Sequence, residues 1–88
     1  MDLGLSGRSA LITGGSKGIG LAAAQSLARE GCSVHLASRT ESDLVAARET
    51  IINECDVEVI IHPVDLSNGD AARALIEACK DVDILVNN

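Results

Sequence analysis

A cluster of glycines between an apolar run and a segment of helical periodicity is the feature that most restricts how this chain can fold. Residues 9–13 predict a strand and residues 18–30 predict a helix, with glycines at positions 14, 15, 18 and 20. The first N–H groups of a helix have no partner within it, and the helix dipole favours negative charge there. Glycine also lets the backbone turn tightly and approach a phosphate. The segment therefore predicts a nucleotide-binding turn rather than a plain one, and it is not a Walker loop, because no Gly-Lys-Ser/Thr follows.

The predicted helix over 18–30 has a regular apolar pattern. Ile19, Ala23 and Leu27 recur every four residues, so we expect them to share one face. Gly31 follows the pattern and is suited to the left-handed conformation that closes a helix.

The rest of the chain repeats this alternation of strand and helix. Two more helices open at Thr40 and Ser67, each followed three positions later by an acid, a pattern typical of helix N-termini. The buried stripe of the second is Leu44, Ala47 and Ile51, and the third runs to about Lys80. The remaining strands are expected over 34–38, 57–62 and 84–86.

This alternation predicts the fold class. Strands separated by helices of this length pair in parallel through right-handed crossovers, and their near-continuous apolar runs are typical of a sheet covered on both faces. We predict an α/β, Rossmann-type fold of three layers with strand order 3-2-1-4, in which residues 1–88 form one incomplete half-domain.

Composition excludes several classes of function. The chain has 13 acidic and 7 basic residues, a net charge of −6, and no Phe, Trp or Tyr. It lacks both the basic field and the aromatic platforms of nucleic-acid binding proteins, and its apolar runs are too short to span a membrane. Residues 1–8 do not resemble a secretory signal.

The cysteines and histidines predict neither a disulfide framework nor a metal site. The three cysteines form no Cys-x-x-Cys pair, and His35 and His62 are far apart in the sequence. We expect the cysteines to be small buried hydrophobes in a reducing, cytoplasmic setting.

Four motifs occur in a consistent order and spacing. The first, Thr13-Gly14-x-x-x-Gly18-Ile19-Gly20, resembles the cofactor motif of the classical short-chain dehydrogenase/reductase family. Ser38-Arg39 resembles its cofactor-selecting position, Asp65-Leu66 its adenine-contacting segment, and Asn87-Asn88 the start of its Asn-Asn-Ala-Gly motif. The resemblance covers the whole chain and is nearest in character to 3-oxoacyl-[acyl-carrier-protein] reductases. It implies a parent enzyme that is a homotetramer or homodimer.

The residues after the second strand favour NADP(H) over NAD(H). An acidic side chain at this position usually holds the ribose 2′-hydroxyl, but here Ser38 and Arg39 precede the first acid, Glu41. A guanidinium pairs with a 2′-phosphate, and Lys17 offers a second positive charge. The alternative is that both basic residues are only solvated surface charges.

The other candidate residues have structural alternatives too. The resemblance implies that Asp65 accepts a hydrogen bond from the adenine amino group; otherwise it caps the third helix, although Ser67 already suits that cap. Asn87 lies at a strand end, where ligands bind in parallel sheets, and it can also stabilise the turn. Ser16 is either a phosphate contact or a turn residue. The predicted cofactor-binding residues are Gly14, Ser16, Lys17, Gly18, Ile19, Gly20, Ser38, Arg39, Asp65, Leu66 and Asn87.

No catalytic residue is assigned. Members of the family use a Tyr-x-x-x-Lys pair and a Ser downstream of the Asn-Asn-Ala-Gly motif, whereas this chain has no Tyr and stops within that motif. We expect a fragment that transfers no hydride alone, from a parent that acts on a small carbonyl or alcohol. One alternative is a non-catalytic dinucleotide-binding module or sensor. Another, a methyltransferase domain, is disfavoured by Arg39.

The predicted topology is itself incomplete. The fourth strand would be an open edge, and the third helix would cover only part of the second sheet face. Such exposed apolar surface favours aggregation, so we expect poor solubility or partial folding of the isolated chain.

Overall fold

A computed structural model describes residues 4–14 and 16–88 and confirms the alternation of strands and helices. Residues 1–3, part of the segment in which we expect no secretory signal, and Gly15 of the glycine-rich turn lie outside the described residues. The elements are β1 (Ser9–Thr13), α1 (Gly18–Arg29), β2 (Ser33–Ser38), α2 (Glu41–Glu54), β3 (Val59–Pro63), α3 (Gly69–Ala78) and β4 (Ile84–Asn87).

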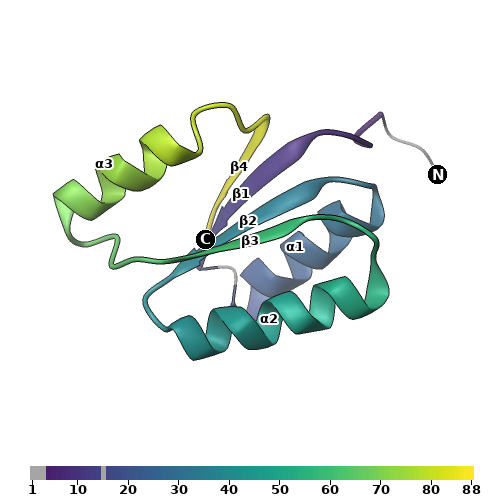
Figure 1. The fold of residues 1–88 in the computed structure, drawn as a ribbon, viewed down its shortest axis with the longest axis horizontal. Coiled ribbons are helices and arrows are strands. Elements are labelled where there is room, and N and C mark those ends of the chain that lie inside the picture. The colour runs from purple at the N-terminus through teal and green to yellow at the C-terminus, as the bar shows by residue number, and fades with distance from the viewer. Residues whose placement is uncertain (1–3, 15) are drawn as a thin grey trace.

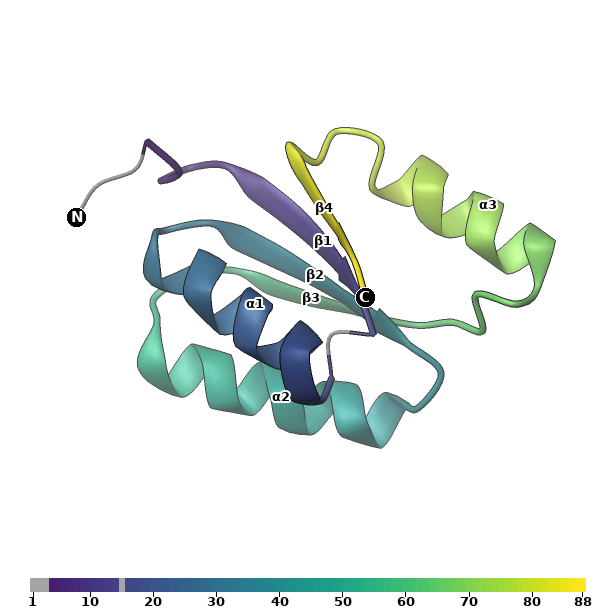
Figure 2. The same cartoon turned by 180° about the vertical axis from the view of Figure 1, so that it is seen from behind.

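The strands form one parallel sheet in the predicted order, β3-β2-β1-β4. Helices α1 and α2 cover one face, and α3 lies over the other (Figures 1 and 2). From β1 the chain adds β2 and then β3 on one side, and it then crosses over to place β4 on the other side of β1. The Rossmann-type, three-layer prediction is therefore confirmed, and the carboxyl ends of all four strands point to the same edge.

The main core lies between the sheet and the first two helices. Alternate residues of β1 and β2 point to this face, because side chains of a strand alternate in direction. The stripe predicted for α2, Leu44, Ala47 and Ile51, is buried as expected. The buried residues of this core are Ala10, Ile12, Ala24, Ala28, Cys32, Val34, Leu36, Leu44, Ala47 and Ile51.

The fully buried stripe of α1 lies one position beyond the predicted one, although Leu27 of the predicted stripe packs partly against the main core. Its buried residues are Gly20, Ala24 and Ala28, and Ile19 is 80% exposed. Both sets have a spacing of four, so periodicity alone does not distinguish them. Small residues face the sheet because the glycine turn brings this helix close to it. Gly31 has φ +91°, and the predicted left-handed closure of the helix is confirmed.

Two predicted helix starts differ in detail. Thr40 occupies the N-cap position of α2 but makes no side-chain capping hydrogen bond. The cap of α3 is Asn68 rather than Ser67: its Oδ1 accepts hydrogen bonds from the N–H groups of Asp70 and Ala71, at 3.0 and 3.1 Å. The strand β3 also includes Pro63, and α3 ends at Ala78, before Lys80.

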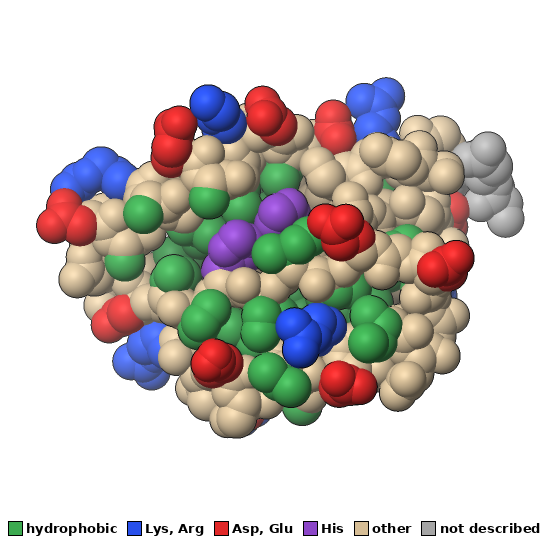
Figure 3. Space-filling model, viewed as in Figure 1, with side chains coloured by type: hydrophobic (Ala, Val, Ile, Leu, Met, Phe, Trp, Pro, Cys, Tyr) green, Lys and Arg blue, Asp and Glu red, His purple; other side chains and the backbone are tan. Residues whose placement is uncertain are grey.

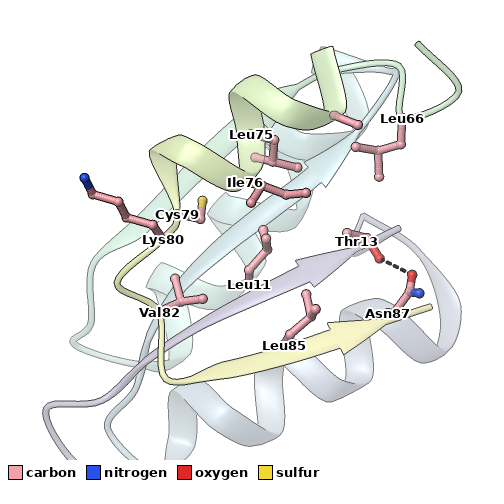
Figure 4. A pocket seen from close by; sticks show the side chains of 11 residues that line it. Leu11, Thr13, Leu66, Leu75, Ile76, Cys79, Lys80, Val82, Leu85 and Asn87 are labelled. Carbon is pink, nitrogen blue, oxygen red and sulfur yellow. Dashed lines mark hydrogen bonds between the residues drawn. The ribbon is translucent and has the colours of Figure 1, made fainter. Parts of the chain in front are cut away.

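The second face of the sheet is thinly covered. Leu11, Ala37, Leu75 and Cys79 form a small second core beneath α3. Beside it an apolar groove of about 480 Å³ runs between α3 and the β1–β4 pair (Figure 4). Ile76 and Leu85 line this groove and are 66% and 64% exposed, as expected for an incompletely covered face. Within the described residues, no helix has the length and apolar character needed to cross a membrane.

Candidate functional site at the strand ends

A cleft of about 450 Å³ lies at the carboxyl ends of the four strands. The apolar groove under α3 is slightly larger, but polar side chains converge on this cleft, so we take it as the candidate site. The two hollows share Thr13, Leu66 and Asn87. The structure brings together in the cleft six of the predicted residues, Gly14, Ser38, Arg39, Asp65, Leu66 and Asn87.

The glycine turn is held closely against its neighbours. The N–H of Gly14 donates to the carbonyl of Ala37 at 2.8 Å, and Gly14 has φ +67°. A Cβ placed on Gly20 would overlap the carbonyl oxygen of Gly14 and lie 2.9 Å from its carbonyl carbon. Glycine at position 20 is therefore needed for the close packing of helix α1 on the turn.

The N-terminus of α1 differs from that of α3 in its cap and in the charge of its first turn. Its N-cap residue, Lys17, makes no side-chain capping bond, and its first turn contains no acid. In α3, by contrast, Asn68 caps the helix and Asp70 lies in the first turn. Uncapped N–H groups at a helix start favour an anion. Ile19, which is mostly exposed, lies at the same end.

The structure does not place Ser16, Lys17, Gly18, Ile19 or Gly20 among the residues that line the cleft. Lys17 Nζ instead forms an ion pair with Asp43 Oδ2 in the first turn of α2, at 3.3 Å. Its side chain is 76% exposed, so this ion pair is weak and the lysine is free to reorient.

The end of β2 carries a buried hydroxyl without a hydrogen-bond partner among the described residues. Ser38 Oγ is buried and has no hydrogen-bond partner within the described part of the chain. Such orphaned polar groups are rare unless a ligand or water completes them. Arg39 follows directly and is exposed at the cleft, where its charge contributes to lowering the pKa of Asp65. A hydroxyl donor beside a guanidinium fits a phosphate.

Asp65 both shapes its loop and keeps a free oxygen. Its Oδ1 accepts hydrogen bonds from the Ser67 hydroxyl at 2.6 Å and the Ser67 N–H at 3.0 Å. These bonds are the largest cause of the lowered pKa of this carboxyl, which keeps it ionised. Neither Asp65 nor Ser67 caps α3, as the alternative interpretation of these residues predicted, because Asn68 is the cap. No described residue hydrogen-bonds to Asp65 Oδ2, which leaves that atom as an acceptor for a ligand.

Sequence reasoning missed the role of Thr13 and Asn88 in holding the turn. Thr13 Oγ1 donates to Asn87 Oδ1 at 3.0 Å (Figure 4). It also accepts from the Asn88 N–H at 3.2 Å. Asn88 Nδ2 donates to the Gly14 carbonyl at 3.4 Å. No pattern in the sequence indicates this contact, because it depends on the parallel register, which pairs Thr13 with Asn87. The structural role that we considered for Asn87 is thus real, and it does not prevent ligand contact.

Comparisons with known proteins agree with this geometry. Residues 8–88 match the family model of short chain dehydrogenases. An L-xylulose reductase from Mesocricetus auratus is 42% identical over 89 residues, which cover 100% of this chain and 34% of that protein. A protein from Streptomyces virginiae, named as a candidate ketoacyl reductase of monensin polyketide synthesis, is 40% identical and covers 92% of this chain and 32% of its own length.

A solved structure gives the same result. The crystal structure of L-sorbose reductase from Gluconobacter frateurii, complexed with NADPH and L-sorbose, superimposes with a TM-score of 0.92 and 38% identity. The match covers 100% of this chain and 35% of that one. The chain thus spans about a third of the length of the relatives that it matches. The resemblance to ketoacyl reductases fits some relatives, and sugar reductases match as well.

Proposed function

The chain belongs to the short-chain dehydrogenase family, and on that premise we propose that residues 1–88 are the NADP(H)-binding portion of an oxidoreductase. The observation that carries this proposal is the end of β2, where the orphaned hydroxyl of Ser38 and the guanidinium of Arg39 share one cleft with the glycine turn. A site for NAD(H) would instead be expected to present an acid there.

Each part of the dinucleotide has a proposed partner. The pyrophosphate lies over Gly14, Ser16, Gly18, Ile19 and Gly20, against the N-terminus of α1. Ser38 and Arg39 hold the 2′-phosphate, and Lys17 leaves Asp43 to add its charge. Asp65 accepts from the adenine amino group through Oδ2, beside Leu66, and Asn87 contacts the cofactor at the end of β4.

The whole protein is proposed to reduce a carbonyl, or oxidise the corresponding alcohol, in the cytoplasm as a homotetramer or homodimer. The nicotinamide supplies or accepts the hydride when bound. This chain's residues bind and orient the cofactor, and none of them is proposed to transfer the substrate proton, since the chain has no Tyr. Two of the matching relatives are named as reductases, one of L-xylulose and one, as a candidate, of ketoacyl groups, which supports a carbonyl substrate.

The test is calorimetric titration of the protein with NADP⁺ and NAD⁺. We expect tighter binding of NADP⁺, and Arg39→Ala to weaken it by on the order of 10- to 100-fold, because a charge-assisted hydrogen bond contributes about 1.5–3 kcal/mol. Binding of NAD⁺ should hardly change.

The matched control is Arg73→Ala, which removes an exposed arginine paired with Asp70 on α3. It should leave both affinities unchanged. Equal loss of both dinucleotides in Arg39→Ala, or no loss of either, would contradict the assignment of the 2′-phosphate to Arg39.

A further inference from the structure

Three metal-binding side chains meet on the sheet face beneath α3, away from the glycine turn. His35 on β2, His62 on β3 and Cys79, the residue after α3, bring one ligand atom each within 4.8 Å of the others. His35 Nδ1 lies 2.9 Å from His62 Nε2, and Cys79 Sγ lies 3.6 and 3.7 Å from these nitrogens. Figure 3 shows the two histidines side by side at the surface, among hydrophobic side chains.

The fold creates this cluster although its members are distant in the sequence. In the parallel register His62 pairs with Ala37, and His35 pairs with Ile60. The two histidines are therefore diagonal neighbours on one face of the sheet. Cys79 reaches them because α3 ends over the same strands. The spacing rules that predicted no metal site apply to ligands from one local motif, and here each ligand comes from a different element.

The two rings are joined edge to edge. Their planes are 18° apart and their centroids lie 5.1 Å apart, which exceeds the nitrogen separation by about the two ring radii. Such rings share one N–H···N hydrogen bond rather than a face-to-face stack. The paired nitrogens thus point at each other, and the thiol lies to the side of both.

The triangle formed by the two nitrogens and the sulfur is close to one face of a tetrahedral coordination site. Zn–N bonds of about 2.0–2.1 Å and a Zn–S bond of about 2.3 Å imply N···S separations of ~3.6 Å and an N···N separation of ~3.3 Å. Both N···S distances already match, and only the hydrogen-bonded nitrogens must separate, by ~0.4 Å, as each ring turns toward the sulfur.

We propose that His35, His62 and Cys79 bind one Zn²⁺ ion through Nδ1, Nε2 and Sγ, with a fourth position open to water. Two imidazoles and a thiolate suit a borderline-soft ion and not Mg²⁺ or Ca²⁺, which prefer oxygen ligands. On binding, the Zn–S bond replaces the S–H bond, and the thiol proton passes to solvent. The proton that lies between the two rings moves to the other nitrogen of its own ring. Each imidazole thus stays neutral, with its proton on the nitrogen that faces away from the ion.

The ion would have a structural effect that the helix otherwise lacks. Among the residues of α3 and Cys79, which follows it, only Leu75 and Cys79 are buried. The rest of the helix is exposed or half-buried. A metal held by Cys79 and by two strands would attach the C-terminal end of this helix to the sheet. The partial exposure of both histidines gives the ion a path of entry.

The experiment is titration of the full chain with Co²⁺ and then Zn²⁺, in a reducing buffer without chelator. We expect one Co²⁺ per chain, a thiolate-to-cobalt charge-transfer band in the near ultraviolet, and visible bands of tetrahedral intensity that Zn²⁺ abolishes. Cys79→Ser should remove the charge-transfer band. His62→Gln should lower the affinity for Co²⁺ by about 100-fold or more. Loss of a residue that only hydrogen-bonds to a metal ligand costs about 10- to 100-fold, and His62 would be a ligand itself.

The matched control is Cys55→Ser, which removes a half-buried thiol outside the cluster and should leave the spectrum unchanged. Circular dichroism of each variant verifies the fold. Absence of a charge-transfer band in the folded wild-type chain would overturn the proposal, as would an unchanged affinity in His62→Gln. None of these results depends on dinucleotide binding, so the two proposals stand or fall separately.

Discussion

At the scale of single residues, the glycine turn is the part of the site in which sequence most nearly determines structure. Gly14 adopts a positive φ and Gly20 meets the backbone of Gly14, and both features follow from residues that the motif predicts. The cap of α3 was not predictable in the same way. Ser67 and Asn68 are adjacent and both suit an N-cap, and only the position of Asp65, which binds Ser67, decides between them.

Gly20→Ala tests the close approach at the turn. The added methyl would overlap the Gly14 carbonyl, so we expect a loss of unfolding free energy of about 1–3 kcal/mol or more, together with loss of dinucleotide binding. Urea unfolding and calorimetry measure the two effects. The control is Gly69→Ala, where a Cβ would meet only the end of Arg73 at 3.6 Å. Equal stability of the two variants would contradict the account.

At the scale of elements, the pairing of β1 with β4 and of β2 with β3 determines which side chains from different strands contact one another. Strand order and helix placement could be predicted, because alternation and apolar runs indicate a parallel sheet and the Rossmann-type fold has a known strand order. The face of α1 could not, because two stripes of equal spacing compete and close packing of glycine and alanine decides. The meeting of His35 with His62 depends on register, which the sequence does not reveal.

Thr13→Val tests the hydrogen bonds that join β1 to β4. The variant keeps the shape but leaves Asn87 Oδ1 and the Asn88 N–H without their partner, so we expect a loss of about 1–3 kcal/mol in unfolding free energy and weaker cofactor binding. Thermal and urea unfolding measure it. Thr50→Val, on the exposed face of α2, should change stability by less than about 0.5 kcal/mol. A Thr13→Val variant as stable as wild type would disprove the structural role.

Protonation of the histidine pair tests the contact between β2 and β3. Desolvation lowers the pKa of both rings, and His35 lowers that of His62 further, while Glu58 opposes the shift at His35. The unfolded chain therefore binds more protons, and stability is fully present above pH about 6.5 and falls as the pH decreases below it.

We expect a double variant, His35→Gln and His62→Gln, to lose this slope, measured by urea unfolding with a chelator present. The thiol of Cys79, which faces the pair from α3, has a pKa raised by burial and stays neutral throughout. The carboxyls with lowered pKa, Asp65 and Asp83, contribute only at lower pH, below about 3.8. Identical slopes for the double variant and wild type would contradict the prediction.

At the scale of the whole molecule, the sheet is well covered on one face and poorly on the other. Strand β4 is an edge of the sheet, and Leu85 and Ile76 expose apolar surface in the groove beside it. Exposed edges and apolar patches of this kind favour association between chains.

Leu85→Lys should therefore reduce concentration-dependent association, measured by light scattering, while leaving the main core intact. Ile52→Lys removes a comparable exposed side chain from α2, outside the groove, and should have a smaller effect. If the two variants associate equally, the groove is not the surface through which the chains associate.

A proton–nitrogen correlation NMR spectrum of the chain, recorded free, with NADP⁺ and with NAD⁺, tests directly whether the strand ends bind NADP(H). We expect the dispersed peaks that shift to be those of the proposed site, and the shifts to be larger with NADP⁺ than with NAD⁺. These residues are Gly14, Ser16–Gly20, Ser38, Arg39, Asp65, Leu66 and Asn87. Dispersed peaks that respond to neither dinucleotide, or that move mainly beneath α3, would contradict the placement of an NADP(H) site at the strand ends.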